Sequence, residues 1–430
     1  MLKTLLQIWN SKDLRKKILF TAGMIILFRA TTHISIPGIN IESLREVLNQ
    51  NKILGVFSLL TGGSAENFSI MLMGLSPYIN ASIIIQLMTV ISPKLEAISK
   101  EGEQGRNTLN KYTRWLTVPL AFLQSYGMIL LLNSQGTIIE NANNPMVILP
   151  IMLTVTTGTI FLMWVGELMS EKGIGNGVSL LIFAGIIANI PTIVGQTLAL
   201  SQQESERLIP FVAIIIITII LTIIIVLVTE GSRNIPITYA RGSKGRGEQA
   251  IIPIRINQAG MIPIIFAVSI VSFPVVVARL FVAHSTTPWI VDASNFIIVY
   301  LQNDRPAYLI IYFLLIIAFT YFYVSITFNP EQVAENIQKR GGFIPGIRPG
   351  SQTALYLRKI SNRLNFFGGV FIGSIALSPL LIQLAASGST FGSVPLLISG
   401  AGMIIIVGVV LDIIRQVNAQ LVMHDYEKFY

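Results

Sequence analysis

The sequence predicts an all-α polytopic membrane protein with ten transmembrane helices. Its composition is the first reason. Hydrophobic residues make up 52% of the 430 residues and charged residues only 12%, whereas soluble proteins carry about 25% charged residues. A mean hydropathy of +0.68 also excludes a disordered chain, which needs low hydrophobicity and high charge. The second reason is that the charge-free stretches have the length that a bilayer requires.

The spans follow from these charge-free stretches, because a spanning helix needs about 20 residues with few or no charges. Seven windows fit one crossing each: 67–93, 115–139, 141–166, 173–203, 208–229, 256–278 and 306–330. Window 364–411 is too long for one helix. Since Ser387–Pro395 in its middle is a cluster of turn residues, this window predicts two crossings. The apolar segment 18–36 completes the ten.

The distribution of Lys and Arg predicts the orientation. If the N-terminus lies inside, the inner segments hold 24 of the 30 Lys and Arg residues and the outer segments hold five. Cytoplasmic loops carry an excess of these residues, so both termini are expected in the cytoplasm. The basic inner face could attract anionic lipid, nucleic acid or acidic protein, or it could serve topology alone.

The spans divide into an N-terminal half, 1–200, and a C-terminal half, 201–430, about a short outer loop. Each half contains five spans, an odd number, so the second half enters the membrane from the opposite side. If the halves are homologous, they are inverted repeats.

A short apolar segment lies in the first outer loop. Residues 53–65 carry no charge and are too few to span a bilayer, as is typical of a re-entrant segment. Thr61-Gly62-Gly63 would end the segment with a flexible backbone. An amphipathic helix on the outer surface fits the segment equally well.

Three inner loops, 93–114, 230–256 and 329–364, are long, basic and rich in Gly and Pro. Within the last of them, 331–340 predicts a short polar helix and 341–350 an irregular, rigid turn. Loops that a rigid scaffold positions commonly carry function. The alternative is that they are solvated linkers.

Side chains for catalysis or cofactor binding are scarce. The chain has no cysteine, which excludes disulfides, iron–sulfur clusters and thiolate zinc sites, and it has no GxxxxGK[ST] phosphate loop. We therefore expect no enzymatic activity and no cofactor or metal. Ion-coupled transporters usually place ionisable residues inside the membrane. Here the intramembrane polar groups are amides: Asn80, Gln86, Gln124, Asn257 and Gln258.

Five motifs resemble the SecY family, the central subunits of the bacterial protein-export channel. In family order they are Gly74–Leu87, Lys100–Arg106, Phe161–Glu167, Gly173–Gly177 and Pro345–Gly350. The resemblance runs from the first span to the last with the same number of spans, and five motifs in order are far more specific than any one of them. It implies two inverted five-helix halves that enclose an hourglass pore.

The resemblance also implies residues for the pore. Its waist would be a ring of aliphatic side chains at Leu75, Ile79, Val178, Ile182, Ile265 and Ile405. A narrow apolar constriction excludes water and ions without offering a fixed partner to a passing chain. Segment 53–65 resembles the plug that fills the idle pore, with Val56, Phe57, Leu59, Leu60, Gly62 and Gly63.

Two further sets of residues follow from the resemblance. A lateral gate, the seam through which an apolar helix leaves for lipid, would contain Asn80, Gln124, Asn257 and Phe273. Arg348 resembles a residue that engages the driving partner, and the basic residues Arg241, Lys244, Arg246 and Arg255 would join it on the inner face. The loop 241–250 is shorter and less basic than in familiar bacterial members.

As partners the resemblance implies small SecE-like and SecG-like membrane subunits, the SecA motor ATPase, the ribosome with its RNA and proteins, signal sequences and precursor polypeptides. The lipid bilayer would be the bacterial plasma (inner) membrane. The predicted function is a protein-conducting channel that moves unfolded polypeptides outward and releases transmembrane segments laterally, driven from outside the chain. Two alternatives remain: an inverted-repeat secondary transporter of a small solute, with the amides as its site, and a lipid-embedded scaffold without a pore.

Overall fold

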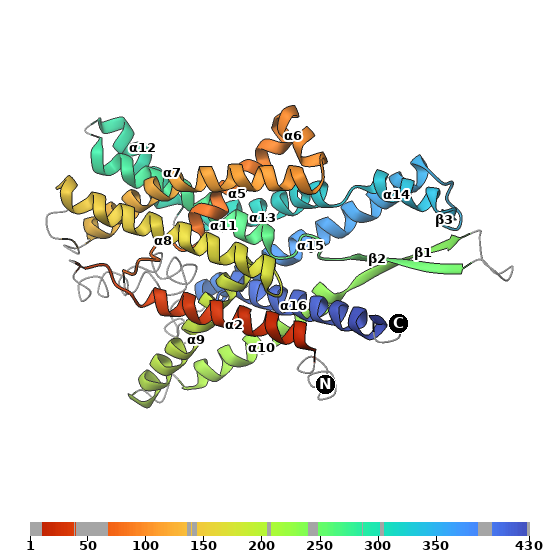
Figure 1. Cartoon of the computed structure of the whole chain (residues 1–430). Coiled ribbons are helices and arrows are strands. Elements are labelled where there is room, and N and C mark those ends of the chain that lie inside the picture. The colour runs from red at the N-terminus through yellow and green to blue at the C-terminus, as the bar shows by residue number, and fades with distance from the viewer. Residues whose placement is uncertain are drawn as a thin grey trace. The chain divides into compact units, whose positions relative to one another are not determined.

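The computed structural model describes residues 11–37, 39, 68–135, 139, 144–203, 208–239, 248–285, 287–301, 305–385 and 398–427. The fold is helical, as predicted (Figure 1). Each of the ten predicted spans coincides with a helix: α2 (Lys12–Thr32), α5 (Ser76–Ile91), α7 (Glu103–Gln135), α8 (Pro145–Lys172), α9 (Gly177–Gln203), α10 (Leu208–Glu230), α11 (Ile262–His284), α13 (Pro306–Thr327), α15 (Ser351–Ala385) and α16 (Gly400–Glu427).

Apolar length supports the membrane assignment. Among the described residues, six helices are long and apolar enough to cross a membrane: α8, α9, α10, α13, α15 and α16. Helix α5 and the short α6 (Pro93–Lys100), which meet at a bend of 103°, would supply a seventh span if they are counted together. The predicted plug, 53–65, and the basic residues Arg241, Lys244 and Arg246 lie outside the described residues.

The chain forms two compact units. Unit 1 contains residues 1–205, 269–308 and 409–430, and unit 2 contains 206–268 and 309–408. Helices α11 and α16 therefore each pass from unit 2 into unit 1. The first boundary falls near the division between the predicted halves, 1–200 and 201–430, and their inverted relationship stays a prediction.

The core of unit 1 includes an irregular segment that precedes α5. Phe68 and Leu72 are fully buried there, together with side chains of α7 and α8. The segment is tied to the end of the first span, because the N–H of Ile36 donates to the carbonyl of Phe68 at 3.1 Å and the N–H of Ile70 donates to that of Ile34 at 3.0 Å. The predicted span 67–93 thus becomes helical only from residue 76.

Unit 2 contains a small sheet that the sequence analysis did not predict. Strands β1 (Ser232–Tyr239) and β2 (Glu248–Arg255) form an antiparallel pair, and β3 (Gly342–Phe343) pairs with β1 at Thr238 and Tyr239, giving the order β2-β1-β3. The polar helix predicted at 331–340 is confirmed as α14 (Pro330–Lys339). Helix α12 (Pro288–Tyr300) was also not predicted.

We call β1, β2, β3, α14 and the first turns of α15 the loop module. Figure 1 shows β3 and α14 beside the start of α15, with β1 and β2 alongside. Its hydrophobic core consists of Ile235, Ile237, Ile254, Ile337, Ile344, Leu357 and Ile360. Because Ile235 and Ile237 alternate with exposed residues on β1, one face of the hairpin is buried against the helices, as is typical of a half-buried strand.

Candidate functional site

The loop between α8 and α9, Gly173–Gly177, is held by side chains from three helices. Thr21 of α2 and Ser170 of α8 accept hydrogen bonds from N–H groups of this loop at 3.2 and 2.8 Å. Gln416 of α16 accepts a third. Because Gly177 is the first residue of α9, the bond from its N–H to Ser170 satisfies a backbone donor that a helix start otherwise leaves unpaired, and the other two bonds fix the loop that leads into α9.

Glycine sets how closely α9 approaches α8. A Cβ on Gly177 would lie 2.0 Å from the carbonyl oxygen of Gly166, so the two backbones touch only because position 177 has no side chain. A methyl of Val178 packs against Gly166. Val178, the first of the predicted ring residues on α9, is therefore fixed by direct contact with α8.

The six predicted ring residues lie near the starts of α5, α9 and α11 and within α16. Leu75 directly precedes α5, and Ile79 follows one turn later. Val178 and Ile182 have the same spacing on α9, which places each pair on one helix face. Ile265 and Ile405 belong to unit 2 and the other four to unit 1, so the closed ring stays a prediction. Three of the six are buried: Leu75, Ile182 and Ile405.

The four predicted gate residues come from α5, α7 and the region of α11. Asn80 lies on α5 and Gln124, which is buried, lies on α7; these two helices pack against each other. Phe273 on α11 is partly exposed. Asn257 is buried, and its Oδ1 accepts a hydrogen bond from the N–H of Gly260 at 2.8 Å. Asn257 therefore stabilises the turn that leads into α11, a role that the sequence analysis missed.

The chain that follows the predicted plug is firmly anchored. A Cβ on Gly158 of α8 would lie 2.1 Å from the carbonyl oxygen of Ile70, so α8 and the segment before α5 are in backbone contact. Together with the burial of Phe68 and Leu72, this contact fixes the segment between Phe68 and α5 against α8.

Two of the five arginines and lysines predicted to bind the driving partner lie in the described part of the loop module. Arg255 ends β2, opposite Ser232, and Arg348 lies in the turn between β3 and α15. Both side chains are exposed. The hydroxyl of Thr353 donates to the carbonyl of Arg348 at 2.9 Å, which holds this turn on the first turn of α15.

The loop module presents further basic side chains that the sequence analysis did not single out. They are exposed, and they are Arg233, Arg340, Lys359 and Arg363. An ion pair between Arg358 and Glu331, at 2.8 Å, links α15 to α14. The basic composition of the two loops was the signal that could have found these residues, but only the fold shows which side chains are exposed.

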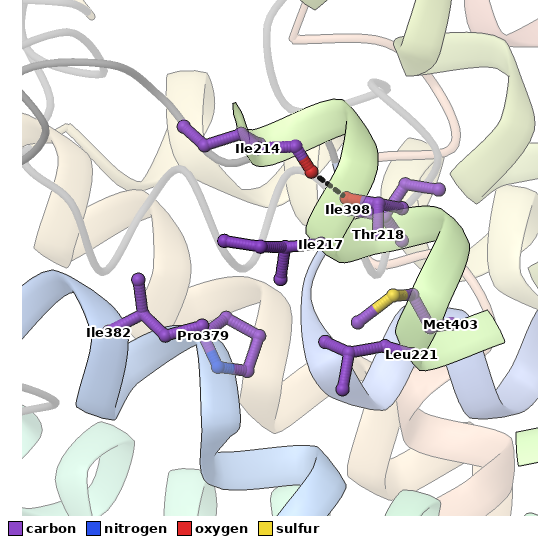
Figure 2. Close-up of a pocket in the computed structure, with 8 residues that line it drawn as sticks. All are labelled: Ile214, Ile217, Thr218, Leu221, Pro379, Ile382, Ile398 and Met403. Atoms are coloured by element: carbon purple, nitrogen blue, oxygen red, sulfur yellow. Dashed lines mark hydrogen bonds between the residues drawn. The ribbon is translucent and has the colours of Figure 1, made fainter. Parts of the chain in front are cut away.

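A small pocket in unit 2 does not provide a polar site. Its volume is about 20 Å³, and it is lined by Ile214, Ile217, Thr218, Leu221, Pro379, Ile382, Ile398 and Met403 (Figure 2). The hydroxyl of Thr218 donates to the carbonyl of Ile214 within α10 at 2.8 Å, so this pocket offers a solute no free donor from that side chain. Among the described residues, no three His, Asp or Glu side chains are grouped to hold a metal ion.

Comparison with known proteins decides the family. The sequence profile of the SecY family matches residues 69–414. The protein translocase subunit SecY of Pseudomonas aeruginosa is 38% identical over 419 residues, which cover 96% of this chain and 92% of that protein. The chain belongs to the SecY family. The SecY subunit of Halalkalibacterium halodurans is 40% identical over the full length of both chains.

Solved structures have the same fold as this SecY family member. One, from a study of how the SecY plug domain stabilises the closed translocation channel, has a TM-score of 0.69 at 19% identity and covers 94% of this chain and 92% of that one. Sec61 in a canine ribosome–channel complex has a TM-score of 0.62 at 19% identity with the same coverage. The prediction of a multi-pass protein translocation channel is thereby confirmed, and the small-solute transporter is not supported.

Proposed function

We propose that this chain forms the pore through which unfolded polypeptides cross the inner membrane of a bacterium, and that both of its termini lie in the cytoplasm. The family match over residues 69–414 carries the proposal. The chain would provide the path and no catalysis, with the work supplied by a motor ATPase or by translation. The 24-to-5 distribution of Lys and Arg supports the orientation.

In this proposal the aliphatic side chains at Leu75, Ile79, Val178, Ile182, Ile265 and Ile405 seal the waist. Segment 53–65 fills the idle pore from the outer side. The seam that contains Asn80, Gln124, Asn257 and Phe273 opens to release apolar helices into lipid. Small SecE-like and SecG-like helical subunits complete the complex.

The loop module is the proposed binding site for the driving partner. It has its own hydrophobic core, so its exposed arginines stand on a rigid support, and rigidly positioned loops are well suited to binding. A cluster of Arg and Lys suits acidic protein surfaces and RNA phosphates alike. The structurally similar Sec61 was solved in a ribosome–channel complex, which supports the ribosome as one partner and leaves a SecA-like ATPase as the other.

The deciding experiment uses proteoliposomes that contain the chain, its small partner subunit and a purified motor ATPase. A signal-bearing precursor should become protected from external protease only when ATP is present. Arg348→Glu should abolish this protection, because it reverses an exposed charge that we propose binds the motor ATPase. The fold of the turn should be kept, since the hydroxyl of Thr353 donates to the backbone carbonyl of residue 348 and not to its side chain.

Arg305→Glu is the matched control. Arg305 is also exposed but lies in the predicted outer segment before α13, so its reversal should leave protection intact. If no protection occurs although all components are folded and bound, the chain is not a protein-conducting channel. If protection survives in Arg348→Glu, the partner engages another surface.

A further inference from the structure

The start of α11 is docked on α15 by a very close backbone contact. A Cβ on Gly368 of α15 would lie 2.7 Å from the carbonyl oxygen of Ile256. The N–H of Ile256 in turn donates to the carbonyl of Gly231, at the end of α10, at 2.9 Å. The segment between β2 and α11 is therefore held between two helices of unit 2.

Next to this contact lies a small polar cluster. The hydroxyl of Ser361 donates to Oε1 of Gln258 at 3.2 Å, and Nδ2 of Asn365 donates to Oγ of Ser361 at 3.4 Å. Ser361, Asn365 and Gly368 lie on one face of α15, because they are four and three residues apart. This face of α15 thus holds residues 256–258 through one backbone contact and one chain of long hydrogen bonds.

The cluster is incompletely satisfied. Within the described part of the chain, Nε2 of Gln258 and Oδ1 of Asn365 are buried and have no hydrogen-bond partner. A buried polar group that lacks a partner is unfavourable relative to the same group in water. Separating Gln258 from α15 would give both groups water to bind, so the structure makes this contact easy to part.

The neighbouring contacts on α15, by contrast, are apolar. Leu357 and Ile360, four residues and one residue before Ser361, belong to the apolar core of the loop module and are buried with Ile235 and Ile254 of the hairpin. On the other side of the cluster, Gly260 adopts a φ of +65°, a conformation that glycine adopts without strain. The polar cluster therefore lies between a well-packed apolar core on α15 and a glycine, Gly260, whose backbone can change conformation at little cost.

We propose that Gln258, Ser361 and Asn365 form a release joint, which holds the start of α11 on α15 while the gate is closed and parts when the gate opens. The proposal rests on the proposed function, because α11 carries the gate residue Phe273. These three residues are positioning residues: they act on the gate through α11 and need not touch the translocating chain. Movement of the loop module together with α15 would reach the gate at this joint.

The first test measures the joint without any translocation. Hydrogen–deuterium exchange on the reconstituted chain should show the amides of 256–261 exchanging faster than those of β1 and β2. Asn365→Leu removes one of the two unpaired groups and should slow exchange at 256–261 several-fold. Asn362→Leu is the matched control, since Asn362 is exposed on another face of the same helix, and it should change nothing there. Equal exchange in Asn365→Leu and the unaltered chain would overturn the joint.

The second test asks whether the joint must part. The chain has no cysteine, so Gln258→Cys with Ser361→Cys creates a unique pair that a short, reducible bis-thiol reagent can bridge. Molecules shown by mass spectrometry to be bridged should lose ATP-dependent precursor protection and regain it on reduction. The control pair Glu331→Cys with Arg358→Cys links α14 to α15 where the two natural side chains form an ion pair at 2.8 Å, and it should retain protection when bridged.

The two tests separate the two proposals. Equal protection in both bridged forms, or equal loss in both, would overturn the release joint. Absence of protection in every form, bridged or not, would instead overturn the proposed channel function, and the exchange rates at 256–261 would still decide whether the contact on α15 is weak.

Discussion

Single side chains decide how closely the helices of unit 1 approach one another. Gly158 and Gly177 each stand where a Cβ would lie about 2 Å from a backbone oxygen, that of Ile70 and that of Gly166 respectively. A backbone oxygen cannot move aside without moving its helix, so these contacts depend on glycine itself. The last position of the motif Gly173–Gly177, one of the five that resemble the SecY family, is therefore explained by the close packing of α9 on α8.

Gly177→Ala should destabilise the protein. The added methyl would push α9 away from α8, and overpacking of this kind costs about 1–3 kcal/mol. Gly195→Ala on the same helix is the control, because no described atom outside the helix lies within 4 Å of its added Cβ and alanine favours a helix by about 0.5–1 kcal/mol. In thermal denaturation in detergent, the midpoint of unfolding should be lower for Gly177→Ala than for the unaltered chain and should not be lower for Gly195→Ala. Equal midpoints in the two variants would contradict the contact.

Ile182→Asn should make the idle channel leak ions. Ile182 is 6% exposed and lies one turn after Val178 on α9, and an amide in a narrow apolar constriction would let water remain there. Ile187→Asn, on the same helix at a position that is 39% exposed, is the control for any effect on conductance of placing an amide in α9 outside the ring. Planar-bilayer conductance should rise only for Ile182→Asn. Equal conductance in both variants would remove Ile182 from the ring.

At the scale of elements, hydropathy predicted the position of each span but not its ends. Charge marks where the bilayer stops, not where a helix stops, so α7 begins at Glu103 although its charge-free window begins at 115. The hairpin β1–β2 was missed because Pro236 and Pro253 interrupt its alternating pattern, and proline argues against a strand. The release joint was missed for another reason: it pairs residues about a hundred positions apart, which only the fold brings together.

The loop module should depend on its own small core. Leu357 is fully buried in that core, whereas Leu355 on the same helix is 62% exposed. Leu357→Ala should therefore cost about 2–5 kcal/mol of local stability, and Leu355→Ala should cost little. Because Leu357 and Ile360 lie before the charge-free part of α15, which begins at residue 364, we expect the first variant to weaken motor ATPase binding while the protein still inserts.

Binding of the ATPase to proteoliposomes, with limited proteolysis of the loop between β1 and β2, measures this effect. Weaker binding with faster cleavage in Leu357→Ala alone is the expected result. Equal binding by both alanine variants would show that the arginines do not need the core as their support.

For the whole molecule, composition was sufficient to predict a helical membrane protein because a bilayer permits few backbone structures, whereas the channel function was predicted only from the five motifs that resemble the SecY family. Every backbone N–H and C=O group in lipid must be hydrogen-bonded within the protein, which favours helices. The distribution of Lys and Arg then predicts which loops face the cytoplasm. The ring and the gate are different in kind. Their predicted residues are divided between the two compact units, and no periodicity in the sequence specifies whether residues so far apart meet.

The predicted orientation can be measured on the intact chain, because the sequence contains no cysteine and every introduced thiol is unique. Ser205→Cys lies in the predicted outer loop and Ser243→Cys in the predicted inner loop 230–256. A membrane-impermeant maleimide should label position 205 in cells with a permeable outer envelope and position 243 only in inverted inner-membrane vesicles. The opposite pattern would place the basic loop module outside, where neither a motor ATPase nor a ribosome could reach it, and would overturn the proposed direction of transport along with the topology.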